Sequence, residues 1–483
     1  MALKPYPAYK DSGLPWLGNV PAHWEVKPNR ALFSEVKDQN HPEEPLLSIT
    51  ISRGVIQQSE LLSDTSKKDS SNIDKSKYKR VLPGDIAYNK MRAWQGAIGA
   101  SQSRGIISPA YVVQRPRAGV VAEYMHHLLR TPAFAKEAER WSYGITSDMW
   151  NLRPEHFKMI YTCLPPVAEQ VAIIRFLDHV DRQIRRYIRA KKNLIKFLEE
   201  QKQAIIYRAV TRGLDPNIPL KSSGVVGLGE IPKHWNVSLL GRCVMLVEQG
   251  WSPVAAEGGL AEEQWAVLTL SSVRRGIFNP AAIKPVSKDA IVPERIEVRN
   301  GDFLLTRSNT RERVGDVCVA ESVRPKTILC DLIYRLGINR EVIDPKFLMF
   351  QLLSPFGRGQ IERDARGSSG TMPKISQGHI KSWRVVVPPI EEQRQIVKSV
   401  TAALGPIDAA TERGQREIYF IGEYRNRLIA NVVTGKFDVR EAAAKLPDDA
   451  EVVEPAEPGE MPAEDEEESK GVELAIPAED VIS

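Results

Sequence analysis

The sequence predicts a mixed α/β protein of the α+β type, in which two long antiparallel coiled-coil helices join two globular domains. Three observations lead to this fold class. One unit of roughly 220 residues is written twice, each copy ends in a long helical pattern with an apolar seam, and the chain closes with an acidic stretch. The duplication indicates an internal pseudo-twofold repeat, and the acidic stretch predicts a disordered C-terminal tail.

At 483 residues the chain is too long for a single ordinary core, and its hydrophobic content of 42% can fill more than one. No apolar run approaches the length of a membrane span, and Met1–Lys10 lacks the apolar core of a signal peptide. We therefore expect a cytoplasmic protein with no membrane partner. The cysteines show no CxxC spacing and are predicted to be reduced structural thiols: Cys163, Cys243, Cys318 and Cys330.

The net charge of +5 conceals an asymmetry between the body of the chain and its C-terminus. Residues 441–483 hold 15 Asp and Glu against 2 Lys and Arg, whereas the remaining 440 residues carry 64 basic and 46 acidic side chains. A basic body favours a polyanionic partner through phosphate contacts, although many soluble proteins are basic without binding nucleic acid. The tail repeats Glu, Pro and Ala, a composition that cannot bury enough surface to fold, and we expect it to act as a solubilising extension.

The repeat is clearest where each copy begins. Residues 10–26 read KDSGLPWLGNVPAHWEV and residues 221–237 read KSSGVVGLGEIPKHWNV, with nine of 17 positions identical at an offset of 211. Further along, PGDIAYNK at 83–90 matches NGDFLLTR at 300–307 at an offset of 217. Ordered matches of this kind are poorly explained by chance.

Both copies then follow the same internal plan. A GxxPxHW opening leads into short β-like runs punctuated by a Gly-Asp turn, and a Pro-Pro pair precedes a long helix. At the start of that helix Ala168–Gln170 matches Glu391–Gln393 at an offset of 223, and near its end Ala209–Thr211 matches Val432–Thr434. The growing offset indicates small insertions in the second copy between fixed landmarks.

The first long helix is predicted between Ala168 and Arg212, a stretch without Pro or Gly. At about 1.5 Å per residue, a helix of about 45 residues spans about 68 Å. Its apolar residues follow steps of four and three, which is the seam of a coiled coil: Ile173, Leu177, Val180, Ile184, Tyr187, Leu194, Leu198 and Ile205.

The second long helix carries a poorer seam, and Gly405–Pro406 is expected to break it into a short and a long segment, with Pro406 opening the second. Two such helices can bury their seams against each other, and antiparallel pairing would place the globular parts at opposite ends. The alternative is that each helix is a core element of its own domain; length and regularity favour the coiled coil. The second seam consists of Ile396, Val400, Ala403, Ile407, Ala410, Ile421, Tyr424 and Leu428.

The sequence contains no recognised catalytic signature. There is no GxxxxGK[ST] phosphate loop, no HExxH zinc helix and no GxSxG elbow, and the Pro-Pro pairs lack the neighbours found in adenine-methylating enzymes. The histidines do not cluster at ligand spacing, and His23 with His234 and His156 with His379 are paired by the repeat, which indicates structural roles. We therefore expect no catalytic residue and no metal site. The copies share turns, caps and seams but differ in their middles, as a scaffold with two different reading surfaces would.

In this order, and twice over, these motifs resemble the specificity subunits of type I restriction–modification systems. The resemblance rests on the GxxPxHW opening, the variable middle, the PPxxEQ helix start and the helix end AVTRG or VVTGK, and it covers residues 10–440. It implies two target-recognition domains, at 24–165 and 223–388, which each read one half of a bipartite, asymmetric site on double-stranded DNA.

The resemblance also implies the remaining domain organisation. An N-terminal opening segment occupies 1–23, a central long helix and linker 166–222, and the C-terminal long helix 389–440. In this family the paired helices act as a ruler that fixes the spacing between the half-sites. The acidic tail at 441–483 lies outside the usual pattern.

The partners and cofactors are implied in the same way. Two modification (methyltransferase) subunits bind the scaffold, carry S-adenosylmethionine and methylate adenine. Restriction subunits with ATP- and Mg-dependent translocase and nuclease activity complete the complex. None of these chemistries resides in the specificity subunit, so the chain is expected to be non-catalytic and to hold no cofactor itself.

The candidate DNA-contacting residues follow the Gly-Asp turn of each copy. Arg and Lys suit the O6 and N7 atoms of guanine, Gln suits adenine, and other polar groups contact phosphate. The two sets differ, as expected if the halves read different bases; the alternative is that they are solvated loop charges. The first copy offers Lys90, Arg92, Trp94 and Gln95, and the second offers Arg307, Asn309 and Arg311.

Two further matched pairs of segments complete the candidates. Loops rich in Gly, Ser and Thr suit phosphate through backbone amides and hydroxyls, and Arg53 and Arg275 each precede a glycine. All of these segments could equally be plain turns. The loop candidates are Thr146 and Ser147 in the first copy and Ser368, Ser369 and Thr371 in the second.

Two other classes of function remain open on the sequence alone. One is a coiled-coil protein-interaction scaffold without DNA sequence readout, which footprinting would distinguish from a specificity subunit. The other is a stand-alone DNA-cleaving or DNA-modifying enzyme with an unrecognised site, which would show activity as an isolated chain.

Overall fold

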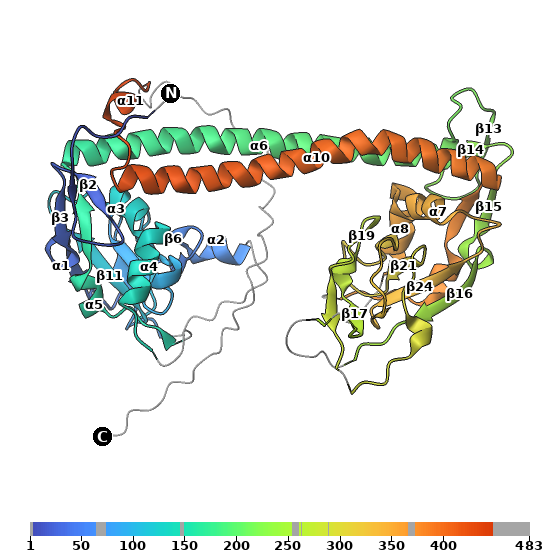
Figure 1. Ribbon diagram of the computed structural model, residues 1–483, viewed down its shortest axis with the longest axis horizontal. Coiled ribbons are helices and arrows are strands. Elements are labelled where there is room, and N and C mark those ends of the chain that lie inside the picture. The colour runs from blue at the N-terminus through green and yellow to red at the C-terminus, as the bar shows by residue number, and fades with distance from the viewer. Residues whose placement is uncertain are drawn as a thin grey trace. The chain divides into compact units, whose positions relative to one another are not determined.

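The computed structural model describes residues 3–63, 74–144, 149–253, 260–261, 263–287, 289–365 and 372–447. The chain divides into two compact units, and Figure 1 shows their elements. Unit 1 comprises Met1–Ile188 and Tyr419–Ser483, and unit 2 comprises Arg189–Ile418. Each unit mixes helices and strands and contains part of both long helices, so the predicted fold class is confirmed.

Unit 1 is built around a four-stranded antiparallel sheet in the order β4-β11-β8-β9. Its strands are β4 (Phe33–Val36), β11 (Tyr111–Pro116), β8 (Ile86–Asn89) and β9 (Ile98–Ala100). Four two-stranded sheets surround it: β1 (Tyr9–Asp11) with β2 (Asn19–Pro21), β3 (Glu25–Pro28) with β12 (Tyr161–Leu164), β5 (Leu47–Thr50) with β6 (Gly54–Gln57), and β7 (Lys79–Val81) with β10 (Gly105–Ile107). Its short helices are α1 (Asn29–Leu32), α2 (Gln58–Ser63), η1 (Ala93–Gln95), α3 (Ala122–Leu129), α4 (Pro132–Arg140) and α5 (Pro154–Met159).

Unit 2 repeats this sheet in the order β16-β24-β21-β22. Its strands are β16 (Val244–Gln249), β24 (Ile333–Ile338), β21 (Phe303–Thr306) and β22 (Val317–Val319). The other sheets are β13 (Leu220–Ser222) with β14 (Glu230–Pro232), β15 (Asn236–Leu239) with β25 (Arg384–Val387), β18 (Val273–Arg274) with β19 (Ile277–Phe278), and a three-stranded sheet of β20 (Ile283–Pro285), β17 (Ala266–Leu268) and β23 (Thr327–Ile328). Its short helices are η3 (Leu240–Arg242), η4 (Leu270–Ser272), η5 (Glu294–Ile296), α7 (Pro345–Leu353), α8 (Pro355–Asp364) and α9 (Gln377–Ser382).

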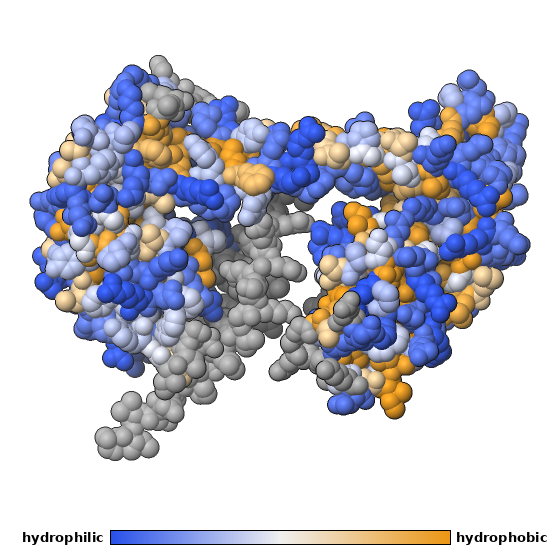
Figure 2. Space-filling view, viewed as in Figure 1, coloured by the Kyte–Doolittle hydropathy of each residue, from blue (hydrophilic) through white to orange (hydrophobic). Residues whose placement is uncertain are grey.

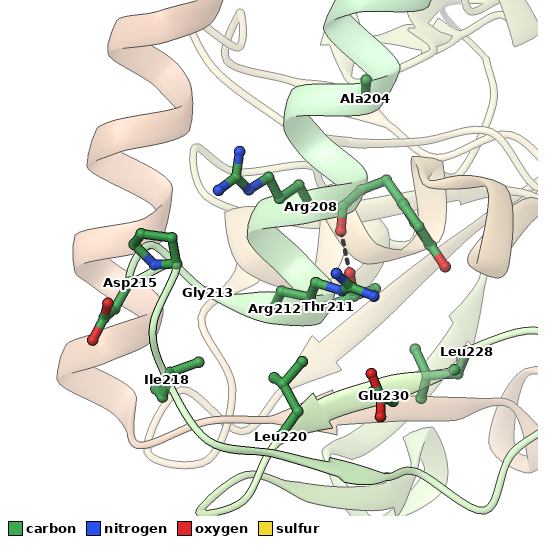
Figure 3. A pocket seen from close by; sticks show the side chains of 13 residues that line it. Ala204, Arg208, Thr211, Arg212, Gly213, Asp215, Ile218, Leu220, Leu228 and Glu230 are labelled. Carbon is green, nitrogen blue, oxygen red and sulfur yellow. Dashed lines mark hydrogen bonds between the residues drawn. The ribbon is translucent and has the colours of Figure 1, made fainter.

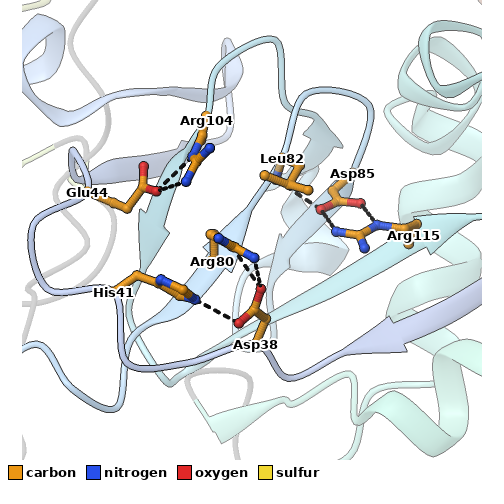
Figure 4. A network of polar contacts seen from close by, with 8 residues as sticks. All are labelled: Asp38, His41, Glu44, Arg80, Leu82, Asp85, Arg104 and Arg115. Atoms are coloured by element: carbon orange, nitrogen blue, oxygen red, sulfur yellow. Dashed lines mark hydrogen bonds and ion pairs between the residues drawn. The ribbon is translucent and has the colours of Figure 1, made fainter.

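The repeated Gly-Asp turn has a structural role in both sheets. In unit 1 the Asp85 carboxylate accepts the Leu82 amide at 2.9 Å and forms two bonds with Arg115 of β11, at 2.7 and 2.8 Å (Figure 4). In unit 2 Asp302 accepts the Arg299 amide at 2.9 Å and pairs with Arg335 of β24 at 2.9 Å. The aspartate therefore closes the turn before a strand and fastens that strand to its neighbour.

The repeated HW and EQ motifs meet at the start of each long helix. Trp24 Nε1 donates to Glu169 Oε1 at 2.9 Å and His23 Nε2 lies 2.7 Å from Glu169 Oε2. Trp235 and His234 make the same contacts with Glu392, at 3.0 and 2.8 Å. In each unit this histidine–tryptophan–glutamate latch fastens the opening segment to the long helix.

The glutamines beside these glutamates hold a second connection. Gln170 donates to the Pro165 carbonyl at 2.8 Å and accepts the Val121 amide at 2.8 Å, just before α3. Gln393 donates to the Pro388 carbonyl at 2.8 Å and accepts the Asp344 amide at 2.8 Å, just before α7. The motif repeats because it fixes the same three-way junction in each unit.

Helices α4 and α8 start at ordinary N-cap residues followed by proline. Thr131 Oγ1 accepts the Phe134 amide ahead of α4, and Ser354 Oγ accepts the Gly357 amide ahead of α8. Proline at the first helical position lacks only an amide hydrogen that would have no intrahelical partner.

The long helices are α6 (Val167–Arg212, 46 residues) and α10 (Ile390–Val433, 44 residues). In unit 1 Asp181 of α6 pairs with Arg425 of α10. In unit 2 Lys191 pairs with Glu417 at 2.7 Å, and Lys202 with Asp408 at 2.7 Å. Because the partner number on α10 falls as the number on α6 rises, the helices run antiparallel, as predicted.

The ends of these helices also belong to the domain cores. In unit 1 Ile173 and Val432 lie in one buried cluster with Trp24, and in unit 2 Ile206 and Ile396 lie in one with Trp235. The two alternatives drawn from the sequence therefore describe different stretches of the same helices.

The predicted seam is wrong in its middle part. Tyr187, Leu194 and Tyr424 are 41%, 47% and 57% exposed, whereas Ile195 packs toward Gly414. A straight helix has 3.6 residues per turn, so a 3.5-residue pattern drifts out of the interface over several turns. Hydrophobic patches interrupt the hydrophilic face in Figure 2; the other exposed large apolar residues of the central helix segments are Phe197, Tyr419 and Phe420.

The expected break at Gly405–Pro406 is also wrong, because α10 continues through Pro406. A proline normally displaces the residue before it from the helical conformation by a clash with that residue's Cβ, and Gly405 has none. Leu404 and Ile407, on either side, are 6% and 8% exposed and anchor the helix to the core.

The predicted start of the tail, at residue 441, is too early. Its first residues form α11 (Arg440–Ala444), and Ala442 and Ala443 are buried in the core of unit 1. Small apolar side chains explain this packing, which an average over the acidic composition of 441–483 conceals. The rest of the expected tail, from 448, lies outside the described residues.

Candidate nucleic-acid interface

The first group of candidates lies on the loop between β8 and β9. Amides and carbonyls within the loop bond to each other: Arg92 donates to the Asn89 carbonyl, and Ala97 donates to the Arg92 carbonyl, both at 3.1 Å. Lys90 fixes the other side, since its carbonyl accepts the Leu152 amide at 2.9 Å. This is a folded loop with a defined backbone, from which the Arg92 and Gln95 side chains start.

The half-buried Trp94 side chain bonds to its own loop. Its indole Nε1 donates to the Met91 carbonyl at 2.9 Å, and its ring packs edge-on against Trp150 at 5.2 Å between centroids. Gln95 is exposed and Arg92 is half-buried. Of this group, Arg92 and Gln95 are therefore better placed than Trp94 to reach a nucleic acid.

Arg53 lies in the turn between β5 and β6, which the structure brings close to the first group. β6 contacts β9, the strand that follows η1. Thr50 Oγ1 accepts the Arg53 amide at 3.0 Å, and Gly54 takes the left-handed conformation at φ +76°. The Arg-Gly pair is therefore a tight turn, with the arginine at its tip.

In unit 2 the matching candidates follow β21. Arg307 is fixed on both sides of its backbone, by its amide to the Leu332 carbonyl at 2.8 Å and by its carbonyl to the Ile375 amide at 2.9 Å. Its guanidinium lies 5.8 Å from the centroid of the Tyr334 ring. Asn309 accepts the Thr310 amide at 2.8 Å, and Arg311 is exposed.

Arg275 occupies the turn between β18 and β19. It adopts φ +42°, a left-handed conformation that is uncommon for a residue with a side chain. Its amide bonds to the Asp316 carboxylate at 3.4 Å, which links this turn to the end of the Arg307 loop. Each unit therefore brings an arginine turn close to the loop that follows the Gly-Asp strand.

The Gly/Ser loop candidates lie outside the described residues: Thr146, Ser147, Ser368, Ser369 and Thr371. Their role in phosphate contact stays a prediction, as does direct DNA contact by the other candidates.

Sequence reasoning missed a partly buried basic group behind the first loop, which consists of His126, His127 and Arg130. Burial lowers the pKa of His126 to about 3 and that of His127 to about 4, so both imidazoles are neutral at pH 7. Burial also lowers the pKa of Arg130, to about 10, which leaves the guanidinium charged. The sequence did contain one signal. When α3 is aligned with α7 at an offset of 223, His126, His127 and Arg130 correspond to the apolar residues Met349, Phe350 and Leu353.

A cavity of about 480 Å³ lies elsewhere in unit 2, between the end of α6 and the β13–β14 hairpin (Figure 3). Arg208, Arg212 and Glu230 line it together with Leu220 and Leu228. None of the candidate DNA-contacting residues borders this cavity, so it belongs to the junction between helix and linker.

The described part of the chain holds no group of three or more His, Cys, Asp or Glu side chains that could bind a metal ion. None of its helices is both long and apolar enough to cross a membrane. All four cysteines are buried and unpaired with one another, and burial raises the pKa of Cys163 to about 12.

No family model matches the chain. Among curated proteins, the chain is 24% identical over 208 residues to the type I restriction enzyme EcoEI specificity subunit of Escherichia coli, an alignment that covers 43% of this chain and 35% of that protein. It is 23% identical over 328 residues to the EcoKI specificity subunit of Escherichia coli strain K12, covering 67% of each. It is 22% identical over 377 residues to the MjaVIII specificity subunit of Methanocaldococcus jannaschii, covering 76% of this chain and 83% of that protein.

The fold also matches that of a solved structure. A chain from a solved structure described as "Structural basis underlying complex assembly and conformational transition of the type I R-M system" superposes with a TM-score of 0.59 at 15% identity, covering 86% of this chain and 99% of that one. The chain is therefore similar in sequence to type I restriction specificity subunits, and it shares its fold with a chain of this solved structure. The matched length is about a third of the EcoEI subunit and two thirds of the EcoKI subunit.

Proposed function

We propose that this chain is the specificity subunit, the sequence-reading and non-catalytic component, of a type I restriction–modification complex. Unit 1 reads one half of a bipartite, asymmetric site on double-stranded DNA and unit 2 reads the other. The chain also serves as the scaffold for the subunits that carry out the chemistry.

One observation carries this proposal: the two units share a frame but not a contact loop. In both units the latch glutamate, Glu169 or Glu392, bonds to a tryptophan, and the turn aspartate, Asp85 or Asp302, bonds to an arginine of the neighbouring strand. The loops that these frames present differ, with Lys90–Gln95 in one and Arg307–Arg311 in the other. A repeated frame suits two like partners, and different loops suit two different base sequences.

The partners follow from the same proposal. Two modification subunits, which bring S-adenosylmethionine and methylate adenine, would bind the repeated frame. Restriction subunits would bring ATP- and Mg-dependent translocation and cleavage. This chain would then need no cofactor of its own.

The test begins with methylation sequencing of the host genome, which would identify the motif that this system modifies. The full chain, assembled with its modification subunit, is then footprinted on a duplex that contains the motif. We expect protection in two separate blocks with an unprotected or weakly protected spacer. A single continuous block, or equal binding to scrambled DNA, would contradict two-part readout and favour a scaffold without sequence preference. Methyl transfer or cleavage by this chain alone would contradict the non-catalytic role.

A further inference from the structure

A single half-buried arginine, Arg130, connects the two candidate contact segments of unit 1. Arg130 follows the last residue of α3, and its side chain donates to four main-chain carbonyls. Nη2 reaches Ile51 at 2.8 Å and Ser52 at 2.6 Å, directly before Arg53. Nη1 reaches Gly96 at 3.2 Å and Ile98 at 2.9 Å, directly after the Arg92–Gln95 loop.

The packing around Arg130 leaves little room for another arrangement. A Cβ added at Gly54 would lie 3.1 Å from Arg130 Nη1 and 3.2 Å from the His126 ring. His126 Nδ1 in turn accepts the Ala100 amide at 3.2 Å, on the strand that leaves the loop. The turn, the loop and the end of α3 therefore form one packed assembly.

Unit 2 reaches the same result with a different arginine. Arg358 of α8 donates to the Val314 carbonyl at 3.0 Å and to the Glu312 carbonyl at 3.2 Å, at the end of the Arg307 loop. It also lies 3.7 Å from the buried Asp316 carboxylate, which accepts the Arg275 amide. Here the connection between loop and turn passes through an ion pair.

The two arginines are not matched by the repeat. At the offset of 223, Arg130 corresponds to Leu353 and Arg358 corresponds to Ala135. Both units nevertheless place a largely buried guanidinium between the arginine turn and the loop after the Gly-Asp strand. The two units thus connect turn and loop through arginines at unrelated positions, which indicates that the relative position of turn and loop is important for function.

We propose that Arg130 and Arg358 are positioning residues for DNA readout, each of which fixes the two contact segments of its own unit against each other. The proposal rests on the proposed function of the two units. Base discrimination depends on donors held at defined places along the groove. Neither arginine needs to touch DNA; each acts through the backbone from which the contacting side chains start.

Lysine is the informative replacement, because it keeps the charge but lacks the planar fork of five donors. In the full chain with its modification subunit, Arg130→Lys is compared with Arg140→Lys, an exposed arginine of α4 that pairs with Glu137. Binding is measured to the identified site and to duplexes with one mismatch in either half. We expect Arg130→Lys to reduce discrimination about tenfold in the half-site of unit 1, to leave the other half-site unchanged, and to leave binding to scrambled DNA within about twofold.

Hydrogen exchange supplies a readout that does not involve DNA. In the free chain, Arg130→Lys should speed amide exchange about tenfold in both 50–54 and 92–98, whereas Arg140→Lys should not. Unchanged exchange in either segment, or equal loss of discrimination in both half-sites, would overturn the proposal. If the wild-type complex discriminates no sequence, the proposed function fails, and the exchange result alone decides whether Arg130 couples the two segments.

Arg358→Lys repeats the experiment with the half-sites exchanged and keeps the test available if Arg130→Lys fails to fold. It should speed exchange in 274–276 and 307–316 and reduce discrimination only in the half-site of unit 2. Loss confined to the half-site of unit 1 would overturn the proposal.

Discussion

Helices α3 and α7 occupy the same place in the two units, but the side chains near the glycine turn are polar in unit 1 and apolar in unit 2. In unit 1 His126 and Arg130 pack against Gly54. In unit 2 a Cβ at Gly276 would lie 2.9 Å from Leu353 Cδ1 and 3.6 Å from Met349 Sδ. The same glycine turn is therefore closed by polar side chains in one unit and by apolar ones in the other, so the repeat preserves a backbone frame and leaves its side-chain chemistry free to diverge.

The latches differ in a similar way. Glu169 is 5% exposed and accepts a third bond from the Tyr6 hydroxyl at 2.5 Å. Glu392 is 25% exposed and bonds to His234 and Trp235. Tyr6, which precedes the first strand, thus adds a hydrogen bond to the latch of unit 1. Matched substitutions in the two latches are therefore expected to change the free energy of unfolding by different amounts.

The largest effect is expected at these latches. Glu169→Ala would leave the Trp24 indole and the Tyr6 hydroxyl buried without an acceptor, at a cost of about 3 kcal/mol in the free energy of unfolding. Glu392→Ala removes a more exposed carboxylate and should cost about 1 kcal/mol. Urea unfolding of both variants, followed by tryptophan fluorescence, measures the difference. Equal losses would show that Tyr6 and burial add nothing to the latch of unit 1.

The second prediction compares the contact loops. Arg307→Ala should reduce discrimination in the half-site of unit 2 by about 1–3 kcal/mol, and Arg92→Ala should do the same only in the half-site of unit 1. Competition binding with single-mismatch duplexes measures both. Because each side chain starts from a loop fixed by backbone hydrogen bonds, neither variant should alter stability by more than about 0.5 kcal/mol. If either variant weakens both half-sites equally, the assignment of one unit to one half-site is wrong.

The third prediction concerns acid. His126 and His127 have native pKa values of about 3 and about 4, against 6.5 for an ordinary histidine. Below pH 6.5 these histidines become protonated in the unfolded chain but stay neutral in the native chain. The free energy of unfolding therefore decreases as the pH falls from 6.5 toward 4. The loss is up to about 1.4 kcal/mol per pH unit for each histidine.

The charged groups around these histidines act in different directions. Arg130 and Arg425 further disfavour protonation of His127, whereas Asp181 favours it. His126→Met introduces the residue that α7 carries at the matching position and should flatten the dependence of unfolding free energy on pH between 7 and 5. An unchanged slope in that variant would mean that His126 does not contribute to acid lability.

Much of the frame could be predicted from sequence because it depends on local and repeated signals. A single sequence is enough to recognise Gly-Asp turns, Pro-Pro helix starts and helix seams. Because these signals occur twice, they showed where each copy of the repeat lies. The middle of the seam was wrong at Tyr187 and Leu194, since small drifts in helical phase accumulate over several turns. The predicted helix break at Pro406 was wrong, because only the structure shows that Gly405 and the packing of the core allow the helix to continue through this proline.

The candidate interface was harder to predict. Arg53, Arg92 and Arg307 could be selected by residue type and proximity to a turn, but Arg130 and Arg358 act through carbonyls far away in the sequence. No spacing rule connects Arg130 to Ile51 or Arg358 to Asp316. Such contacts depend on tertiary packing, and the repeat cannot reveal them because the two units use different positions.

The smallest effect is expected at the ion pairs between the long helices. In unit 2 the side chains of the Lys191–Glu417 ion pair are partly exposed, and Glu417→Gln should cost about 0.5 kcal/mol or less, an effect that 1 M salt should remove. In unit 1 Asp181 contacts both Arg425 and Arg185; burial by itself would raise its pKa, but these arginines lower it below the ordinary value. Asp181→Asn should therefore cost more than Glu417→Gln and depend less on salt. Urea unfolding of both variants at low and high salt tests this order, and a larger, salt-resistant loss for Glu417→Gln would show that the helix pair in unit 2 depends on its ion pairs rather than on Ile195 and its apolar neighbours.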